Sequence, residues 1–167
     1  MAGSDSSDDG SDVAAESLEA SIVDHIGVPL WLTSRQWVRE MYRRAALRGF
    51  ADVTETDSEV LAYLPLKGLS ISALARRRGV TKQAMQEAVR SLVKRGVLAL
   101  EADPADRRAR RVVYTRRGLE FVAAFQAIKR DMQAEVVAVL GADGVAALET
   151  GLAQVRTALG AADAPDP

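Results

Sequence analysis

The sequence predicts a mainly α-helical protein that carries one small β-hairpin. Apolar residues recur every three or four positions along most of residues 23–160, which is the period of a helix. Only near residues 97–115 does the pattern change to two short segments, rich in β-branched residues, around a turn. The chain has 167 residues, of which 48% are hydrophobic, so it is long enough to bury the core of one domain.

The composition excludes most kinds of catalytic site. The chain has no cysteine and one histidine, His25, which excludes disulfides, thiolate zinc sites, cysteine nucleophiles and histidine-pair metal sites. Sensing by thiol oxidation is excluded for the same reason. The sequence also offers no pair of acids placed for acid–base catalysis and no glycine-rich phosphate loop. We therefore expect a protein that is not an enzyme and that has no catalytic residues, no cofactor and no metal.

The ends of the chain and its hydropathy suggest a cytoplasmic protein without a membrane partner. The longest uninterrupted apolar runs, such as Val136 to Leu140, are far shorter than the roughly 18 residues that a membrane span needs. The first residues lack the basic start and apolar middle of a secretory signal. Residues 1–22 form an acidic tail and residues 161–167 a second tail, and both have too few large apolar residues to offset the entropy of ordering. We expect both tails to be disordered.

Charge is segregated along the chain, although the formal net charge is only -1. The first 24 residues contain seven acids and no lysine or arginine. From Lys67 to Arg117 the sequence has fourteen bases and four acids, a net charge of +10. A basic stretch is often only a solvated face, so its place on a recognisable scaffold decides whether it meets a polyanion. The acidic tail could compete with a polyanion for this face, but we favour an inert, solubilising role.

The first helical segment occupies residues 23–55, with a long amphipathic helix expected from Leu30 to Arg48. Residues 56–116 form the next segment. It opens with Thr56 and Glu59, which fit a capping box for a short helix. The carboxylates Asp57 and Glu59 are expected to be helix-start residues and not a catalytic pair.

A helix-turn-helix follows in the same segment. The pattern predicts a helix from Ser72 to Arg78, a left-handed turn at Gly79 and a second helix that Thr81 caps and that runs to Arg95. Strands at 97–101 and 110–115 then flank a turn rich in arginine. A helix-turn-helix followed directly by a hairpin is a winged helix-turn-helix, so residues 56–116 are expected to be a DNA-binding lobe.

The last segment, residues 117–160, is predicted to form two helices. They run from about Arg117 to Leu140 and from about Asp143 to Leu159, with glycines between them. The apolar stripe on these helices is too long for this small domain to cover, so we expect a partner helix from a second copy of the chain. The interface residues expected from this pattern are Phe121, Phe125, Ile128, Met132, Leu148 and Leu152.

The second helix of the helix-turn-helix has one apolar face and one polar face. Met85, Val89 and Leu92 belong to the core face. The polar face fits a major groove, because Gln can pair with adenine and Arg with guanine, while Lys binds phosphate. The hairpin arginines fit a minor groove, with Asp106 able to orient one of them. The expected DNA-binding residues are Thr81, Lys82, Gln83, Gln86, Arg90, Lys94, Asp106, Arg107, Arg108 and Arg110.

Three stretches carry a resemblance to a known family. They are Ile71–Ala84, Leu92–Gly96 and above all Asp103–Gly118, whose hairpin reads DPADRRA and ends in Thr115 and a glycine. Together they resemble the multiple antibiotic resistance regulator (MarR) family. The resemblance implies a homodimeric winged-helix transcription regulator whose first and last helices form the dimer interface. It also implies that Arg108 reaches the minor groove and that Asp106 takes the place of the family's wing aspartate.

The resemblance further implies a small effector, commonly an aromatic or phenolic anion, that binds between the dimerisation helices and the DNA-binding lobe and releases DNA. The matching wall would comprise Trp31, Trp37, Met41 and Tyr42, with Arg35 as an anion partner. Such an aromatic stripe is also typical of an ordinary helical core.

Together these observations predict a repressor that binds a pseudo-palindromic duplex operator as a homodimer, with half-sites about 10 base pairs apart. The alternative from another class is a winged-helix module for protein–protein contact, in which the basic face meets an acidic partner. That alternative predicts weak binding to any DNA and tolerance of changes at Gln83 and Gln86.

Overall fold

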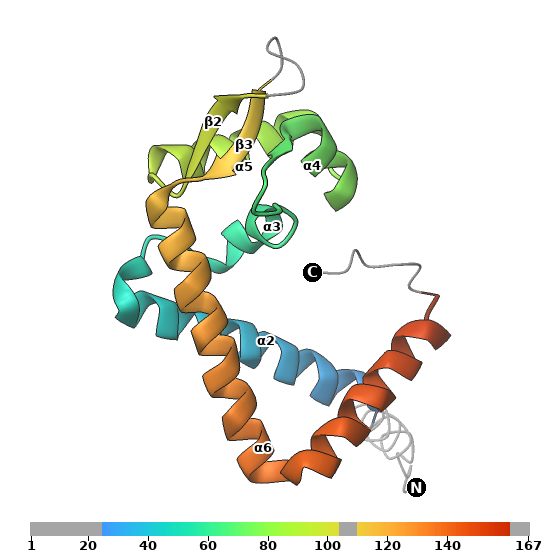
Figure 1. The fold of residues 1–167 in the computed structure, drawn as a ribbon. Coiled ribbons are helices and arrows are strands. Elements are labelled where there is room, and N and C mark those ends of the chain that lie inside the picture. Colours follow the sequence, from blue (N-terminus) through green and yellow to red (C-terminus); the bar gives the residue numbers. More distant parts are fainter. Residues whose placement is uncertain (1–24, 104–109, 161–167) are drawn as a thin grey trace, which may run out of the picture. The chain divides into compact units, whose positions relative to one another are not determined.

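The computed structural model describes residues 25–103 and 110–160 of the chain (Figure 1). The expected tails and the turn of the hairpin lie outside these residues. In chain order the elements are α2 (Gly27–Ala45), η1 (Ala46–Phe50), η2 (Glu55–Asp57), α3 (Ser58–Leu61), β1 (Leu69–Ser70), α4 (Ile71–Arg78), α5 (Lys82–Lys94), β2 (Leu98–Ala102), β3 (Arg110–Tyr114) and α6 (Arg116–Ala158). The chain divides into two compact units, one up to Glu40 and one from Met41 onward.

The first helix begins earlier than the hydrophobic period suggested and is followed by a wider turn. α2 ends at Ala45 and passes into the π-helical turn η1, in which Gly49 takes a left-handed backbone conformation (φ 92°). From Met41 onward, the side chains of Met41, Ala45 and Phe50 are buried. Two ion pairs join this part of the chain to α6, from Arg44 to Glu135 at 2.7 Å and from Arg48 to Asp131 at 2.9 Å.

The capping box lies two residues before the expected one, so the prediction of Thr56 and Glu59 was wrong. Thr54 is the capping residue, and its amide and hydroxyl donate to Asp57 Oδ2 at 2.7 and 3.2 Å. The box opens the short 3-10 turn η2, and α3 follows directly. The spacing of Thr and acid is the same in both cases, so only the extended backbone at Thr54 (φ -111°, ψ 169°) distinguishes them.

The helix-turn-helix forms as predicted. Ser70 Oγ accepts from the Ala73 amide and caps α4, which ends at Gly79 in a left-handed conformation (φ 74°, ψ 30°). Thr81 then caps α5, with its Oγ1 accepting from the Ala84 amide at 3.2 Å. Met85, Val89 and Leu92 of α5 are all buried, which confirms the apolar face read from the sequence.

The wing is a three-stranded antiparallel sheet in the order β1-β3-β2, so it has one strand more than the expected hairpin. The register pairs Leu69 with Val112 in one ladder and Glu101 with Arg111 in the other. β1 has only two residues, too few to show an alternating pattern in the sequence. Val112 and Val113 are both buried, so this end of the wing belongs to the core of the lobe.

The junction between β3 and α6 explains the Thr115–Gly118 part of the sequence motif. Thr115 Oγ1 accepts from the Gly118 amide at 3.0 Å and donates to the carbonyl oxygen of Gly96 at 2.6 Å. A Cβ atom at Gly118 would lie 2.1 Å from the carbonyl oxygen of Val97. Glycine is therefore required for the first turn of α6 to approach the start of β2 so closely.

α6 consists of two helical arms that meet at Gly141, as the sequence predicted. Gly141 has φ 71° and ψ 167°, a backbone conformation available almost only to glycine. We call residues 142–158 the distal arm. In Figure 1 the bend separates the orange and red parts of this element.

By length and composition alone, α6 contains an 18-residue stretch apolar enough to cross a membrane, and 6% of that stretch is buried. The sequence expectation of no such stretch considered only uninterrupted apolar runs, whereas a longer window such as residues 136–153 tolerates Asp143 and Glu149. A bilayer requires one continuous helix of about 20 residues, and the break at Gly141 interrupts this one. The exposed apolar surface is therefore better suited to a partner helix.

The six expected interface residues differ in their surroundings. Phe121, Ile128 and Met132 are buried within the chain itself, and Phe125 stacks on Phe121 with ring centroids 5.1 Å apart. Tyr42 also packs on Phe125 and Phe50 on Phe121, with ring centroids 5.2 and 5.4 Å apart. These four residues therefore have core partners, whereas Leu148 and Leu152 in the distal arm are 47% and 39% exposed. An interface built on α6 has to use the distal arm and the residues just before it.

Candidate nucleic-acid interface

Helix α5 presents a continuous polar face to solvent. The side chains of Lys82, Gln83, Gln86, Arg90 and Lys94 are all exposed, at steps of three and four that place them on one face. The opposite face is buried in the lobe, so the helix cannot rotate without losing its core contacts. Thr81 is also exposed, and its hydroxyl is already engaged in capping α5. The arrangement presents two amides and three cations on one rigid helix, which is the chemistry needed to read base edges and hold phosphates.

The wing divides its arginines into two kinds. Arg110, the first residue of β3, is exposed. Arg111 points the other way in the strand and is held by the sheet, with its guanidinium 3.6 Å from Glu101 and donating to the carbonyl oxygen of Lys67 at 3.3 Å. Its Nε is buried and has no hydrogen-bond partner among the described residues. The predicted residues Asp106, Arg107 and Arg108 lie outside the described residues.

Behind the C-terminal end of α5 lies a network of four charged residues, Asp52, Asp57, Arg95 and Arg117, which we call the Arg95 network. Arg95 donates through both terminal nitrogens to Asp57, at 2.7 and 2.5 Å, and also donates to the carbonyl oxygen of Asp52. Arg117 donates to both carboxylate oxygens of Asp52, at 2.9 and 2.6 Å, and to the carbonyl oxygen of Arg95 at 2.7 Å. Paired donors of this kind hold both partners in one orientation.

The pKa values of the network carboxyls reflect this pairing. Burial disfavours the charged form of Asp57, but hydrogen bonds from Arg95 and Thr54 outweigh it and hold the pKa of Asp57 below its ordinary value. The hydrogen bonds from Arg117 lower the pKa of Asp52. Both carboxylates are therefore charged at neutral pH, and the network joins the end of α5, the loop at 52–57 and the first turn of α6.

Sequence reasoning did not find the Arg95 network. Asp57 was interpreted only as a helix-start residue, and Arg95 only as the end of a helix. Arg95 is separated from Asp57 by 38 residues and Arg117 from Asp52 by 65, so no local spacing signals either pair. Only the fold brings them together.

A second anchor holds the wing. The hydroxyl of Tyr114 lies 3.0 and 3.2 Å from the carbonyl oxygens of Leu61 and Leu64, to which it donates. Burial raises the pKa of Tyr114 to about 12, so the hydroxyl keeps its proton. The two carbonyl oxygens therefore satisfy the hydroxyl group of this partly buried tyrosine.

The residues proposed as an effector wall have differing surroundings. Trp31 is 57% exposed, and the guanidinium of Arg35 lies over its ring at 5.0 Å from the centroid. Trp37 is half-buried and Met41 is buried. Tyr42 is packed against Phe125 with ring centroids 5.2 Å apart, and burial raises its pKa to about 12. Across residues 25–103 and 110–160, no three His, Cys, Asp or Glu side chains gather as a metal site.

Comparisons with known proteins agree with this geometry. The sequence model of the MarR family matches residues 51–109, which cover the helix-turn-helix and strands β1 and β2 of the wing and end before β3. No curated protein sequence matches the chain significantly.

Many solved structures share the fold, and three of them are typical. One is MepR, described as a transcription regulator of the Staphylococcus aureus multidrug efflux pump MepA, with a TM-score of 0.63 and 20% identity over 81% of this chain and 98% of that one. A second is the Staphylococcus aureus MepR–DNA complex, with a TM-score of 0.61, 20% identity and coverage of 81% and 96%. The third is wild-type MarR from E. coli without ligand, with a TM-score of 0.59, 22% identity and coverage of 78% and 96%. At these identities the likeness establishes the fold.

Proposed function

Because the chain belongs to the MarR family of winged-helix regulators, we propose that it regulates transcription by binding a duplex DNA operator. The observation that carries the proposal is the polar face of α5, with five exposed donors opposite a buried apolar face. In this proposal Gln83, Gln86 and Arg90 read base edges, whereas Lys82 and Lys94 hold phosphates. Thr81 and Arg110, which are also exposed, are proposed as further DNA contacts.

The wing supplies the second contact in this proposal. Arg108, with Arg107 beside it and Asp106 orienting it, enters the minor groove, where a narrow A·T tract attracts arginine. Arg111 is assigned to the sheet instead, because Glu101 and the Lys67 carbonyl already hold its guanidinium.

We propose a homodimer, because an operator of two half-sites needs two copies of α5. The exposed leucines of the distal arm support it: Leu148 and Leu152 lie four residues apart, so they share one face of the helix. A twofold dimer would place its helices in successive major grooves, which requires a pseudo-palindrome with half-site centres about 10 base pairs apart. Repression follows if such an operator overlaps a promoter, and we propose that the protein acts in the cytoplasm.

The effector remains part of the proposal: a small aromatic or phenolic anion that contacts Trp31, Arg35, Trp37, Met41 and Tyr42 and releases DNA. Its support is the exposed Trp31 with Arg35 over its ring, which together form a flat, cationic surface. Release would work by favouring a lobe spacing that does not fit DNA.

The test is a selection of bound duplexes from a random DNA pool, followed by binding of the winner across a salt series. We expect a pseudo-palindrome and a steep fall in affinity with salt, because lysine and arginine release counterions from phosphates. If no sequence is enriched and binding stays weak throughout, the basic face serves an acidic protein partner instead.

A further inference from the structure

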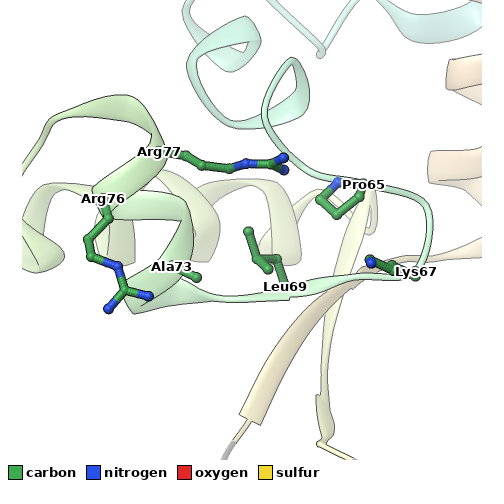
Figure 2. Close-up of a pocket in the computed structure, with 6 residues that line it drawn as sticks. All are labelled: Pro65, Lys67, Leu69, Ala73, Arg76 and Arg77. Atoms are coloured by element: carbon green, nitrogen blue, oxygen red, sulfur yellow. The ribbon is translucent and has the colours of Figure 1, made fainter. Parts of the chain in front are cut away.

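A hollow of about 700 Å³ lies on the DNA-binding lobe between α4 and the turn that leads into β1. Its lining is Pro65, Lys67, Leu69, Ala73, Arg76 and Arg77 (Figure 2). Among the residues that the structure describes, none that is expected to read DNA or to bind an effector lines it. Its volume is in the range typical of sites for small molecules.

The lining combines an apolar floor with cations. Figure 2 shows Leu69 and Ala73 along one side, Arg77 reaching toward Pro65 on the other, and Arg76 and Lys67 at opposite ends. No acid of residues 25–103 or 110–160 lines the hollow. An occupant therefore needs negative charge to meet the cations and an apolar body to cover the floor.

Two of these cations have no partner side chain or carbonyl group in the part of the chain that the structure describes. The side chains of Lys67 and Arg76 are exposed there and make no hydrogen bond or ion pair. Arg77, by contrast, donates from one terminal nitrogen to the carbonyl oxygen of Tyr63 at 3.2 Å, which holds its guanidinium beside the hollow. The site thus has one cation fixed in place and two that are available.

We propose that this hollow binds a small organic anion, with a carboxylate or phosphate held by Lys67, Arg76 and Arg77 and an apolar body on Leu69 and Ala73. A bare DNA phosphate would leave most of the volume and the apolar floor unused. The inference does not depend on the proposed operator, since it concerns only the lining of the hollow. Because α4 packs on α5, an anion bound here lies on the same lobe as the proposed DNA-reading face.

The experiment uses the full chain labelled with nitrogen-15 in a phosphate-free buffer, titrated with benzoate, phenyl phosphate and neutral benzamide. We expect at least one anion to cause saturable shifts of backbone amides near Leu69, Ala73 and Arg77. Benzamide has the same apolar ring without the charge, so it should cause no saturable shift there. If neither anion shows saturable binding, or if benzamide binds equally well, the proposal is overturned.

Variants locate the site. Lys67→Gln and Arg76→Gln should each weaken anion binding roughly tenfold, since each removes a charge-assisted contact. Arg130→Gln removes the same charge from an exposed position on α6 and should leave anion binding unchanged. All variants lie at exposed positions, and thermal melting checks that they fold. Equal anion binding by the wild type and the Lys67→Gln/Arg76→Gln double variant would contradict the proposal.

A DNA-binding experiment distinguishes a small organic anion from a phosphate of the DNA backbone as the group that these cations bind. The Lys67→Gln/Arg76→Gln variant is compared with wild type for binding to a random-sequence duplex across a salt series. If it lowers the salt slope by about two, and neither anion binds the wild type, the cations are contacts to the DNA backbone and the proposal is overturned. If the double variant loses anion binding and keeps the salt slope of the wild type, the proposal is supported. It is also supported if the wild type binds an anion but selects no DNA operator, since that result contradicts only the proposed operator function.

Discussion

Helix α5 and the distal arm of α6 are both exposed helical surfaces, but their chemistry is opposite. α5 shows solvent a row of amides and cations, and its apolar residues are buried in the lobe. The distal arm shows solvent Leu148, Leu152 and Val155, and among its residues only Val145 is buried. A polar helix face at a surface is stable by itself, whereas an apolar one costs free energy until a partner covers it. The charges of α5 therefore suit a polyanion, whereas the exposed leucines of the distal arm suit another apolar helix.

The largest expected effect comes from breaking the apolar surface. Replacing Leu148 and Leu152 together by aspartate places two charges where we propose a second copy to pack, and no such interface can bury them unpaired. We expect complete loss of the dimer, measured by light scattering during size-exclusion chromatography. The control Thr150→Asp adds a charge to the same arm but leaves Leu148 and Leu152 in place. It should retain more dimer than the double variant does. An unchanged dimer in the double variant would show that the distal arm is not the interface.

The next effect tests what holds α5 in place. Asp57→Asn removes the charge opposite Arg95 and leaves a partly buried guanidinium without its bidentate partner. We expect a loss of about 2 kcal/mol in the free energy of unfolding, measured with denaturant. Glu55→Gln, an exposed change in the same turn, should alter stability by less than about 0.5 kcal/mol.

The contribution of the Asp57–Arg95 pair to stability should also depend on pH. The pKa of folded Asp57 lies below its ordinary value of about 3.9, so the stabilisation is fully present above that value. It is lost as the pH falls through the folded pKa. The wild type should therefore lose more stability below about pH 4 than Asp57→Asn does. Parallel curves for the two proteins would mean that Asp57 is not held as a charged partner.

Substitutions on α5 should distinguish residues that contact bases from residues that contact phosphates. Arg90→Ala should cost about 1–3 kcal/mol of binding to the selected operator and little on random DNA. Lys82→Ala should weaken both kinds of DNA alike and reduce the salt slope by about one. Both are measured by fluorescence anisotropy across a salt series. Identical behaviour of the two variants would refute this division of roles on α5.

The smallest expected effect concerns the break before the distal arm. Gly141→Ala places a side chain on a backbone with φ 71° and ψ 167°, and no atom lies within 4 Å of the new Cβ. Its cost is therefore backbone strain, about 1–2 kcal/mol, seen as a lower melting temperature. A higher melting temperature would mean that the two arms prefer one continuous helix.

Sequence patterns were most informative where a few neighbouring residues specify a structure. Thr81, Gly79 and the apolar face of α5 lie in one short stretch, so their spacing predicted the helix-turn-helix directly. The break at Gly141 was predicted in the same way. The polar face of α5 followed as well, because the residues opposite a buried helix face must be exposed.

Elsewhere local patterns were ambiguous or absent. Thr54 and Thr56 stand at the same spacing from an acid, and only the backbone showed which of them caps a helix. Phe121, Ile128 and Met132 continue the apolar stripe of α6, but the sequence does not show that the chain itself buries them.

The sequence alone therefore determined the winged-helix lobe, its polar helix face and the break in α6, because local backbone preferences and the helical period decide these features. Tertiary structure alone decided the Arg95 network, the third strand of the wing and the division of α6 into covered and open surfaces. Each of those depends on residues far apart in the chain, such as Asp57 and Arg95. Their pairing follows from the packing of whole elements, which no short stretch of sequence records.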